Sequence, residues 1–158
     1  RTVTLMSLNK TFNFPGAGLG WMICKNPSLR EMASNRIGSL IPHPEIFGYV
    51  ATNAAIRDGE DWRLDLLDYL NQNRKLLIER INRIPGLKIY DIEASYLGWI
   101  SCESLAIENP HQLFLNYGVA LQPGSMFNQA KHVRINIATN HSLLKKALDL
   151  MEKAVESI

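Results

Sequence analysis

A long segment of helical periodicity, residues 60–84, is the feature that most constrains how this chain can fold. Its apolar residues recur at the three- and four-residue spacing that places them on one face of an α-helix. They are Trp62, Leu66, Tyr69, Leu70, Leu76, Leu77, Ile81 and Ile84. Pro85-Gly86 ends the segment, because proline cannot continue a helix. A helix of about 24 residues would be about 36 Å long, which is enough to connect two domains.

The pattern after this segment changes to short strands that alternate with helices. We expect strands at 87–90, 96–102, 119–121 and 132–138, and helices at 109–117 and 140–155. Asn109-Pro110 and Asn140 each supply the capping chemistry of a helix start. Strands interleaved with helices predict a small α/β sandwich, in which helices cover one sheet.

The region before the long helix begins with an apolar and β-branched run, residues 2–6, that predicts a buried strand. A second strand is expected at 21–24, and helices at 27–36 and 44–57. The glycines between the two strands, at positions 16, 18 and 20, lack the GxGxxG register of a dinucleotide-binding loop. We interpret them as a bend in which backbones pass closely.

Composition excludes several classes of protein. With 46% hydrophobic and 20% charged residues the chain is expected to be globular. A net charge of +2 without a Lys/Arg block argues against a nucleic-acid partner, and no apolar stretch reaches the length of a membrane span. The four histidines show no metal-ligand spacing. Cys24 and Cys102 lack CxxC spacing, which favours buried free thiols in a reducing cytoplasm.

Lys10 is the first candidate for a reactive side chain. It follows a strand that is expected to be buried, and partial removal from water favours the neutral amine over the ammonium ion. A neutral lysine amine is the nucleophile that a Schiff base requires. The alternative is a lysine that reaches from a strand end to solvent. The residues alone leave both interpretations open.

Four motifs carry a resemblance to a known family. Ser7-x-x-Lys10 followed by Thr-Phe-Asn and the glycine-rich bend resembles the lysine segment of fold-type I enzymes that use pyridoxal 5'-phosphate (PLP). Within that superfamily it is similar to the MalY/PatB group of cysteine-S-conjugate (cystathionine) β-lyases, which stand with the class I/II aminotransferases. Tyr-Leu-Gly-Trp-Ile at 96–100, Gly-Val-Ala-Leu-Gln-Pro-Gly at 118–124 and Val-Arg-Ile-Asn at 133–136 follow in the family's order and spacing.

The resemblance implies an α/β fold of the aspartate-aminotransferase type. Residues 1–59 would be the C-terminal piece of the large PLP-binding domain, 60–86 a long linking helix, and 87–158 the small C-terminal α/β domain. In this family the aromatic that stacks on PLP and the aspartate that pairs with the pyridine nitrogen precede the lysine, and neither has a counterpart here. We therefore expect the C-terminal part of a longer enzyme, inactive by itself.

The resemblance also implies roles for three residues. Lys10 would bind PLP covalently and take the Cα proton of the substrate, and Ser7 would donate to the cofactor phosphate. Arg134 would bind the α-carboxylate of an amino-acid substrate. The residues support this last role independently, because a charge between Val133 and Ile135 needs a partner and a guanidinium matches a carboxylate fork. The alternative for Arg134 is a structural ion pair or a strand face open to solvent.

The activity that follows from the resemblance is PLP-dependent C–S β-elimination from cystathionine or cysteine conjugates, by a cytoplasmic homodimer. The products would be a thiol, pyruvate and ammonia. A class I/II aminotransferase is the near alternative, because the same lysine and arginine serve both reactions. Gly18 stands where many aminotransferases carry a phosphate-binding arginine, which leans away from the aspartate-aminotransferase type. A third hypothesis is a non-catalytic module that binds a partner.

Overall fold

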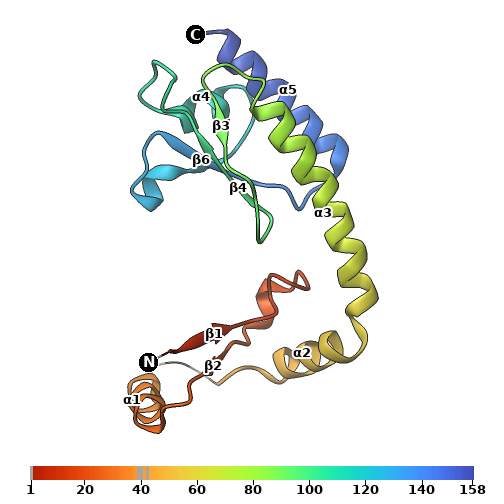
Figure 1. The fold of residues 1–158 in the computed structure, drawn as a ribbon, viewed down its shortest axis with the longest axis vertical. Coiled ribbons are helices and arrows are strands. Elements are labelled where there is room, and N and C mark those ends of the chain that lie inside the picture. Colours follow the sequence, from red (N-terminus) through yellow and green to blue (C-terminus); the bar gives the residue numbers. More distant parts are fainter. Residues whose placement is uncertain (1, 39–40, 42) are drawn as a thin grey trace. The chain divides into compact units, whose positions relative to one another are not determined.

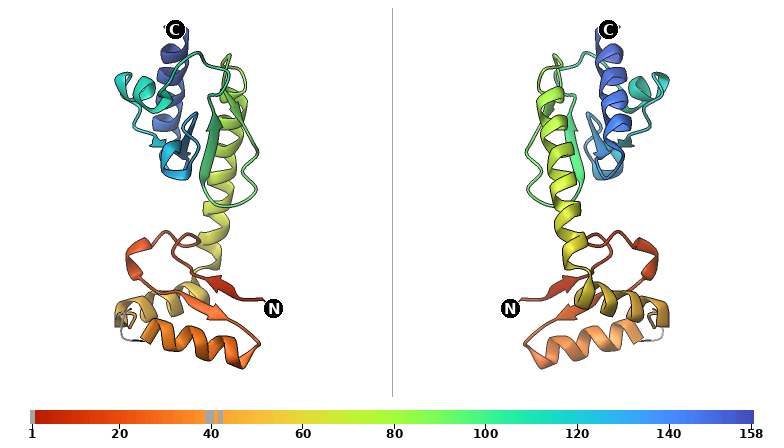
Figure 2. Two further views of the ribbon diagram at one scale, coloured as in Figure 1. Left: turned by 90° about the vertical axis from the view of Figure 1, so that its left-hand side faces the viewer. Right: turned by 90° about the vertical axis from the view of Figure 1, so that its right-hand side faces the viewer.

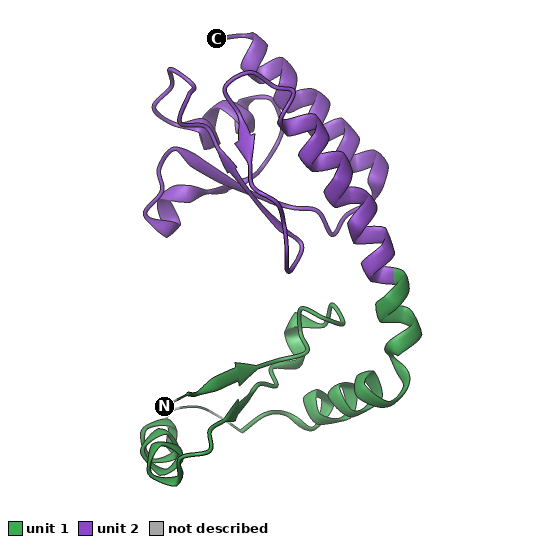
Figure 3. Cartoon of the chain, in the orientation of Figure 1, with its two compact units in different colours: residues 1–65 green, residues 66–158 purple. Residues whose placement is uncertain are grey.

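The computed structural model describes residues 2–38, 41 and 43–158. The chain divides into two compact units, residues 1–65 and 66–158 (Figure 3). Each unit has its own small sheet and its own helices (Figure 1). The connection between the helices expected at 27–36 and 44–57 falls in part on residues outside those described.

Unit 1 contains a two-stranded antiparallel sheet of β1 (Thr4–Met6) and β2 (Trp21–Ile23), with the 3-10 helix η1 (Pro15–Ala17) between the strands. Helices α1 (Pro27–Ile37) and α2 (Ile46–Asp58) follow, and α3 (Glu60–Ile81) begins in this unit. The Asn26 side chain accepts a hydrogen bond from the Leu29 amide at 3.1 Å. This cap confirms the expected start of α1.

The expectation that the first strand is buried is wrong for the described chain. Leu5 in β1 is 77% exposed, because β1 pairs only with β2 and a two-stranded sheet offers little cover to its side chains. The apolar face expected for α2 is exposed too, with Phe47 at 76%. Helix α2 instead packs through Gly48, where a Cβ atom would collide with the Ala17 carbonyl oxygen. Periodicity identified an apolar face in both segments, but no described element of unit 1 covers it.

Unit 2 is built on a four-stranded antiparallel sheet in the order β3-β4-β6-β5. The strands are β3 (Lys88–Ile89), β4 (Leu97–Ser101), β5 (Gln122–Pro123) and β6 (His132–Asn136). Helix α4 (Pro110–Asn116), the 3-10 helix η3 (Gly124–Phe127) and helix α5 (His141–Glu156) complete the unit together with the rest of α3. Asparagine side chains at 109 and 140 cap α4 and α5, as expected.

Helices α3 and α5 lie side by side on one face of this sheet (Figure 2). Arg80 of α3 forms ion pairs with Asp149 at 2.7 Å and Glu152 at 3.0 Å on α5. The core between the helices and the sheet includes Leu77, Ile81, Ile100, Val133, Ile135, Leu144, Leu148 and Met151. Burial of each such side chain contributes about 1.5–3 kcal/mol relative to exposure. The hydrophobic layer therefore holds unit 2 together.

Two helical faces differ from the expected stripes. Trp62, expected on the apolar face of the long helix, is 47% exposed, and Leu143, expected on the face of the last helix, is 56% exposed. The α3 helix also ends at Ile81 rather than at residue 84. The amides of Arg83 and Ile84 bond to the carbonyls three residues before them, which makes a tight final turn.

The strand expected at 119–121 lies directly after those residues, as β5 at Gln122–Pro123. Val119 and Leu121 are buried, but in the loop that precedes the strand. Proline lacks the N–H group that a central strand would need. β5 is an edge strand of the sheet, so Pro123 costs no hydrogen bond on the open side.

Asn73, a polar residue at the centre of α3, is fully buried. Its Nδ2 donates to the carbonyl oxygens of Ile137 at 2.9 Å and Thr139 at 3.0 Å. Its Oδ1 lies 2.8 Å from Nδ1 of His141, which therefore carries the ring hydrogen. Tyr69 extends this cluster: its hydroxyl donates to the Thr139 carbonyl and accepts the His141 amide. The cluster fastens the chain between β6 and α5 to α3.

We predict that Asn73→Leu lowers the free energy of unfolding of unit 2 by about 2–4 kcal/mol, because the buried hydrogen bond to the Ile137 carbonyl is lost and the Thr139 carbonyl keeps only the Tyr69 hydroxyl as a donor. Native-state hydrogen exchange of the Leu77 and Ile81 amides measures this change directly. Gln72→Leu, at the exposed neighbouring position on the same helix, is the matched control and should change the value by less than about 0.5 kcal/mol. Equal exchange in both variants would contradict the clamping role.

Candidate functional site

Lys10 lies in the turn that follows β1, with its side chain exposed. The backbone around it is fixed by hydrogen bonds from the Phe12 amide to the Leu8 carbonyl at 3.0 Å and from the Phe14 amide to the Asn9 carbonyl at 3.1 Å. Lys10 is thus an exposed residue on a backbone that the turn holds in place. The partly desolvated lysine expected from a buried strand is not what unit 1 shows, because β1 itself is exposed.

Ser7 bridges the two ends of the same loop. Its hydroxyl donates to the Leu19 carbonyl at 3.0 Å and accepts the Asn9 amide at 3.2 Å. A hydroxyl has one hydrogen, so Ser7 can donate to another group only after it turns away from Leu19. Beside it, the Oδ1 atom of Asn9 is buried and accepts no hydrogen bond from the described residues.

Phe12 anchors the lysine loop to the junction between α2 and α3. Its ring stacks on Phe14 at 6.2 Å and on Trp62 at 6.1 Å between centroids. A Cβ atom on Gly59 would lie 2.7 Å from the Phe12 ring, so only glycine lets the ring pack there. The sequence contained Phe12 within its lysine motif, but nothing in the local pattern indicated this anchoring role.

Arg134 is a half-buried residue of β6, between cross-strand partners Gln122 of β5 and Trp99 of β4. Its Nη2 donates to the Gln122 side-chain oxygen, and its guanidinium carbon lies 5.0 Å from the centre of the Phe127 ring. Among the described residues, no Asp or Glu forms an ion pair with Arg134. The structural ion pair considered from the sequence is therefore not found in the described part of the chain.

A cluster of aromatic rings lies against the Arg134 side chain. Phe127 meets Trp99 edge to face at 5.4 Å, and Trp99 stacks on His132 at 5.4 Å. Phe127 belongs to η3, which turns tightly at Gly124. A Cβ atom at Gly124 would collide with the carbonyl oxygens of Gln129 and His132. The tight turn at Gly124 thus brings the Phe127 ring against the guanidinium.

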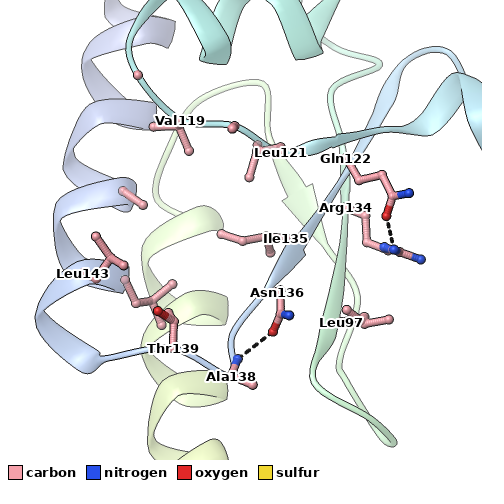
Figure 4. Close-up of a pocket in the computed structure, with 14 residues that line it drawn as sticks. Leu97, Val119, Leu121, Gln122, Arg134, Ile135, Asn136, Ala138, Thr139 and Leu143 are labelled. Carbon is pink, nitrogen blue, oxygen red and sulfur yellow. Dashed lines mark hydrogen bonds between the residues drawn. The ribbon is translucent and has the colours of Figure 1, made fainter. Parts of the chain in front are cut away.

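A pocket of about 580 Å³ borders Arg134 (Figure 4). This volume is in the range of small-molecule sites. Figure 4 shows the side chains of Arg134 and Asn136 on one side of β6 and that of Ile135 on the other. The pocket therefore has a polar part around Arg134, Gln122 and Asn136 and an apolar part against α5.

Among the described residues, neither the two cysteines nor a cluster of metal-ligand side chains offers a rival site. Burial raises the pKa of the Cys102 thiol to about 12, which removes it as a nucleophile near neutral pH. Cys24 is also buried and unpaired, so the expectation of two buried free thiols is confirmed. No cluster of three metal-ligand side chains occurs among the described residues. In the same part of the chain, no helix has both the length and the hydrophobicity needed to cross a bilayer.

The predicted site residues fall into two groups. Ser7 and Lys10 belong to one loop of unit 1, and Arg134 belongs to the sheet of unit 2. Sequence reasoning did not find Gln122 or Phe127, because both act on Arg134 across strands. For Gln122 the available signal was its place in the Gln-Pro-Gly segment, whose strand was expected at 119–121 and lies at 122–123; Phe127 lies outside that segment, in η3.

Comparison with known proteins gives consistent results. Residues 1–150 match the family described as aminotransferase class I and II. A Mycobacterium leprae protein provisionally named a cystathionine beta-lyase is 29% identical over 97% of this chain and 44% of its own length. An aspartate aminotransferase of Pyrococcus horikoshii is 26% identical over 98% of this chain and 41% of its own length. The chain thus spans less than half the length of these relatives.

Solved structures match this chain over the same extent. The crystal structure of OvoB superimposes with a TM-score of 0.95 at 36% identity and covers 99% of this chain and 41% of its own. The PLP-bound C–S lyase from Staphylococcus hominis superimposes with a TM-score of 0.84 at 30% identity and covers 97% of this chain and 42% of its own. These matches confirm the predicted aspartate-aminotransferase-like α/β fold.

Proposed function

The chain belongs to the aminotransferase class I and II family, and from that premise we propose that it forms the C-terminal part of a PLP-dependent C–S β-lyase. The substrate would be cystathionine or another cysteine conjugate, and the products a thiol, pyruvate and ammonia. The relative named as a cystathionine beta-lyase and the PLP-bound C–S lyase structure support this choice. Below, the full-length enzyme means the longer protein that carries this chain.

The residues of unit 1 fit a PLP site in two respects. Lys10 is an exposed residue on a turn whose backbone is fixed by hydrogen bonds. The Ser7 hydroxyl lies in the same loop and can serve a phosphate once it releases the Leu19 carbonyl. When bound, PLP supplies the electron sink that stabilises negative charge at the substrate Cα. Lys10 would hold the cofactor and then take the Cα proton.

One observation carries the proposal: Arg134 is a half-buried cation beside a pocket and has no acid partner among the described residues. A charge removed from water needs compensation. Gln122 and Phe127 hold the guanidinium but are both neutral. Its positive charge therefore remains available to an anionic ligand, and its planar fork suits a carboxylate. We assign it to the α-carboxylate of the amino-acid substrate.

An aminotransferase is the second candidate, since the Pyrococcus horikoshii relative is named as one. Gly18 weighs against the type that carries a phosphate-binding arginine at this position. It has a φ of 59° at the end of η1, a backbone conformation that side chains other than glycine rarely adopt. An arginine would be strained there, so phosphate binding would come from other residues.

A cytoplasmic, homodimeric enzyme remains part of the proposal. The two buried, unpaired cysteines support a reducing compartment. The assembly state is best measured on the full-length enzyme by light scattering.

The first prediction separates the two activities. We expect the full-length enzyme, supplied with PLP and cystathionine, to release pyruvate without an added keto acid, because elimination needs no amino acceptor. A lactate dehydrogenase assay measures the pyruvate. Product formation that requires a keto acid would instead identify an aminotransferase. Absence of both reactions would favour the non-catalytic module.

The second prediction concerns Lys10. We expect Lys10→Ala to abolish turnover in the full-length enzyme while substrate binding, measured by calorimetry, persists. Lysine at this position supplies both cofactor attachment and proton transfer. Lys25→Ala, at another exposed lysine of unit 1, is the matched control and should retain activity. Near-normal turnover of Lys10→Ala would rule out the PLP assignment of this residue.

The third prediction concerns Arg134. Arg134→Lys keeps the charge and loses the fork, so kcat/KM of the full-length enzyme should fall by roughly 10- to 1000-fold, or about 1.4–4 kcal/mol. The loss should be much smaller for a substrate analogue that lacks the α-carboxylate, because that analogue never uses the contact. Equal losses for both compounds would mean that Arg134 supports the fold and does not bind substrate.

A further inference from the structure

Gln122 and Arg134 face each other across β5 and β6. Directly opposed residues of an antiparallel pair project to the same face of the sheet. The Gln122 side-chain oxygen accepts a hydrogen bond from Nη2 of Arg134 (Figure 4). One of the five N–H groups of the guanidinium is thereby occupied, and the donors on its other edge stay available.

The orientation of the Gln122 carboxamide is fixed by a second contact. Its Nε2 group donates to the Met126 sulfur at 3.6 Å. This contact turns the carboxamide oxygen, and not the nitrogen, toward Arg134. Met126 lies in η3, next to Phe127, whose ring lies under the guanidinium. A single tight turn therefore orients Gln122 and also supplies the aromatic support for Arg134.

Because Gln122 is neutral, it can hold Arg134 without forming an ion pair with it. A glutamate at the same place would offer a carboxylate to the guanidinium and form the internal ion pair that the described structure lacks. The amide oxygen holds the side chain without cancelling its charge. The arrangement restrains a long side chain before a ligand arrives, which lowers the entropy lost on binding.

We propose that Gln122 is a positioning residue: it holds the Arg134 guanidinium on Phe127 so that one edge of the fork is presented to the carboxylate of the substrate. This inference rests on the proposed function, because it takes the ligand of Arg134 to be a carboxylate. It assigns Gln122 no contact with the substrate and no part in proton transfer.

The test compares Gln122→Glu and Gln122→Met in the full-length enzyme. Gln122→Glu places a competing carboxylate on Arg134, so KM for the amino-acid substrate should rise about 10-fold or more, with kcat changed less than about 3-fold. Gln122→Met retains side-chain length without the amide and should raise KM about 3- to 10-fold. Neither variant should alter the reaction of an analogue without the α-carboxylate. Gln112→Glu, the same change on exposed α4, is the matched control.

The pH profile separates positioning from general damage. Protonation of the introduced carboxyl frees Arg134, so the KM defect of Gln122→Glu should shrink as the pH falls, whereas that of Gln122→Met should not. A second readout needs no activity: NMR of the Arg134 side chain in the full-length enzyme should show slower rotation of the guanidinium in the wild type than in Gln122→Met.

The outcomes distinguish this inference from the proposed function. Unchanged KM and unchanged NMR in both variants, with Arg134→Lys impaired, would overturn the role of Gln122 and leave the proposed function intact. Unchanged KM with altered NMR would equally overturn it, because the restraint would then not serve binding. If Arg134→Lys itself shows no carboxylate-dependent loss, both the proposed function and this inference fail.

Discussion

Burial of one face of the four-stranded sheet under α3 and α5 is the constraint on which the rest of unit 2 depends. Val133 and Ile135 of β6 point into that layer, as does Ile137 just beyond the strand. Side chains of a strand alternate between faces, so this burial forces Arg134 and Asn136 to the opposite face. A slip of one residue would exchange the two sets and bury the arginine. The position of the candidate ligand-binding cation is therefore set by hydrophobic packing and not by any contact that the cation makes.

On the opposite face, neutral side chains hold the Arg134 guanidinium in place without neutralising its charge. Trp99, Phe127 and Gln122 surround Arg134 with an aromatic ring and an amide, and no described acid pairs with it. Arginines 74, 80 and 83 in the same unit all meet carboxylates. This difference matters because an unpaired, partly buried charge lowers the stability of the folded state. A ligand that brings its own carboxylate would offset this cost.

The sequence was enough to predict interactions between residues close together in the chain, such as helix caps. It was not enough to predict which residues face each other across the sheet. The asparagine caps of α4 and α5, which were predicted, depend on residues a few positions apart, and so does the cap of α1. Arg134 was recognised because a lone charge between β-branched residues is unusual within a strand. Gln122 and Phe127 were not, because their partner lies across the sheet. Asn73 was missed since a polar residue in an apolar stripe resembles an exposed one. The strand at β1 was expected to be buried because it is an apolar run, and an apolar run does not say what covers it.

The residues around Lys10 and those around Arg134 are held by separate sets of contacts. The loop of Lys10 is fixed within unit 1, through its turn and through Phe12 packed over Gly59. Arg134 is fixed within unit 2, through Gln122 and the η3 turn. Among the described residues, none of these hydrogen bonds and ring contacts joins the residues around Lys10 to those around Arg134. Because groups without shared partners behave nearly independently, we expect a substitution at Gln122 or Phe127 to leave the loop that carries Lys10 undisturbed.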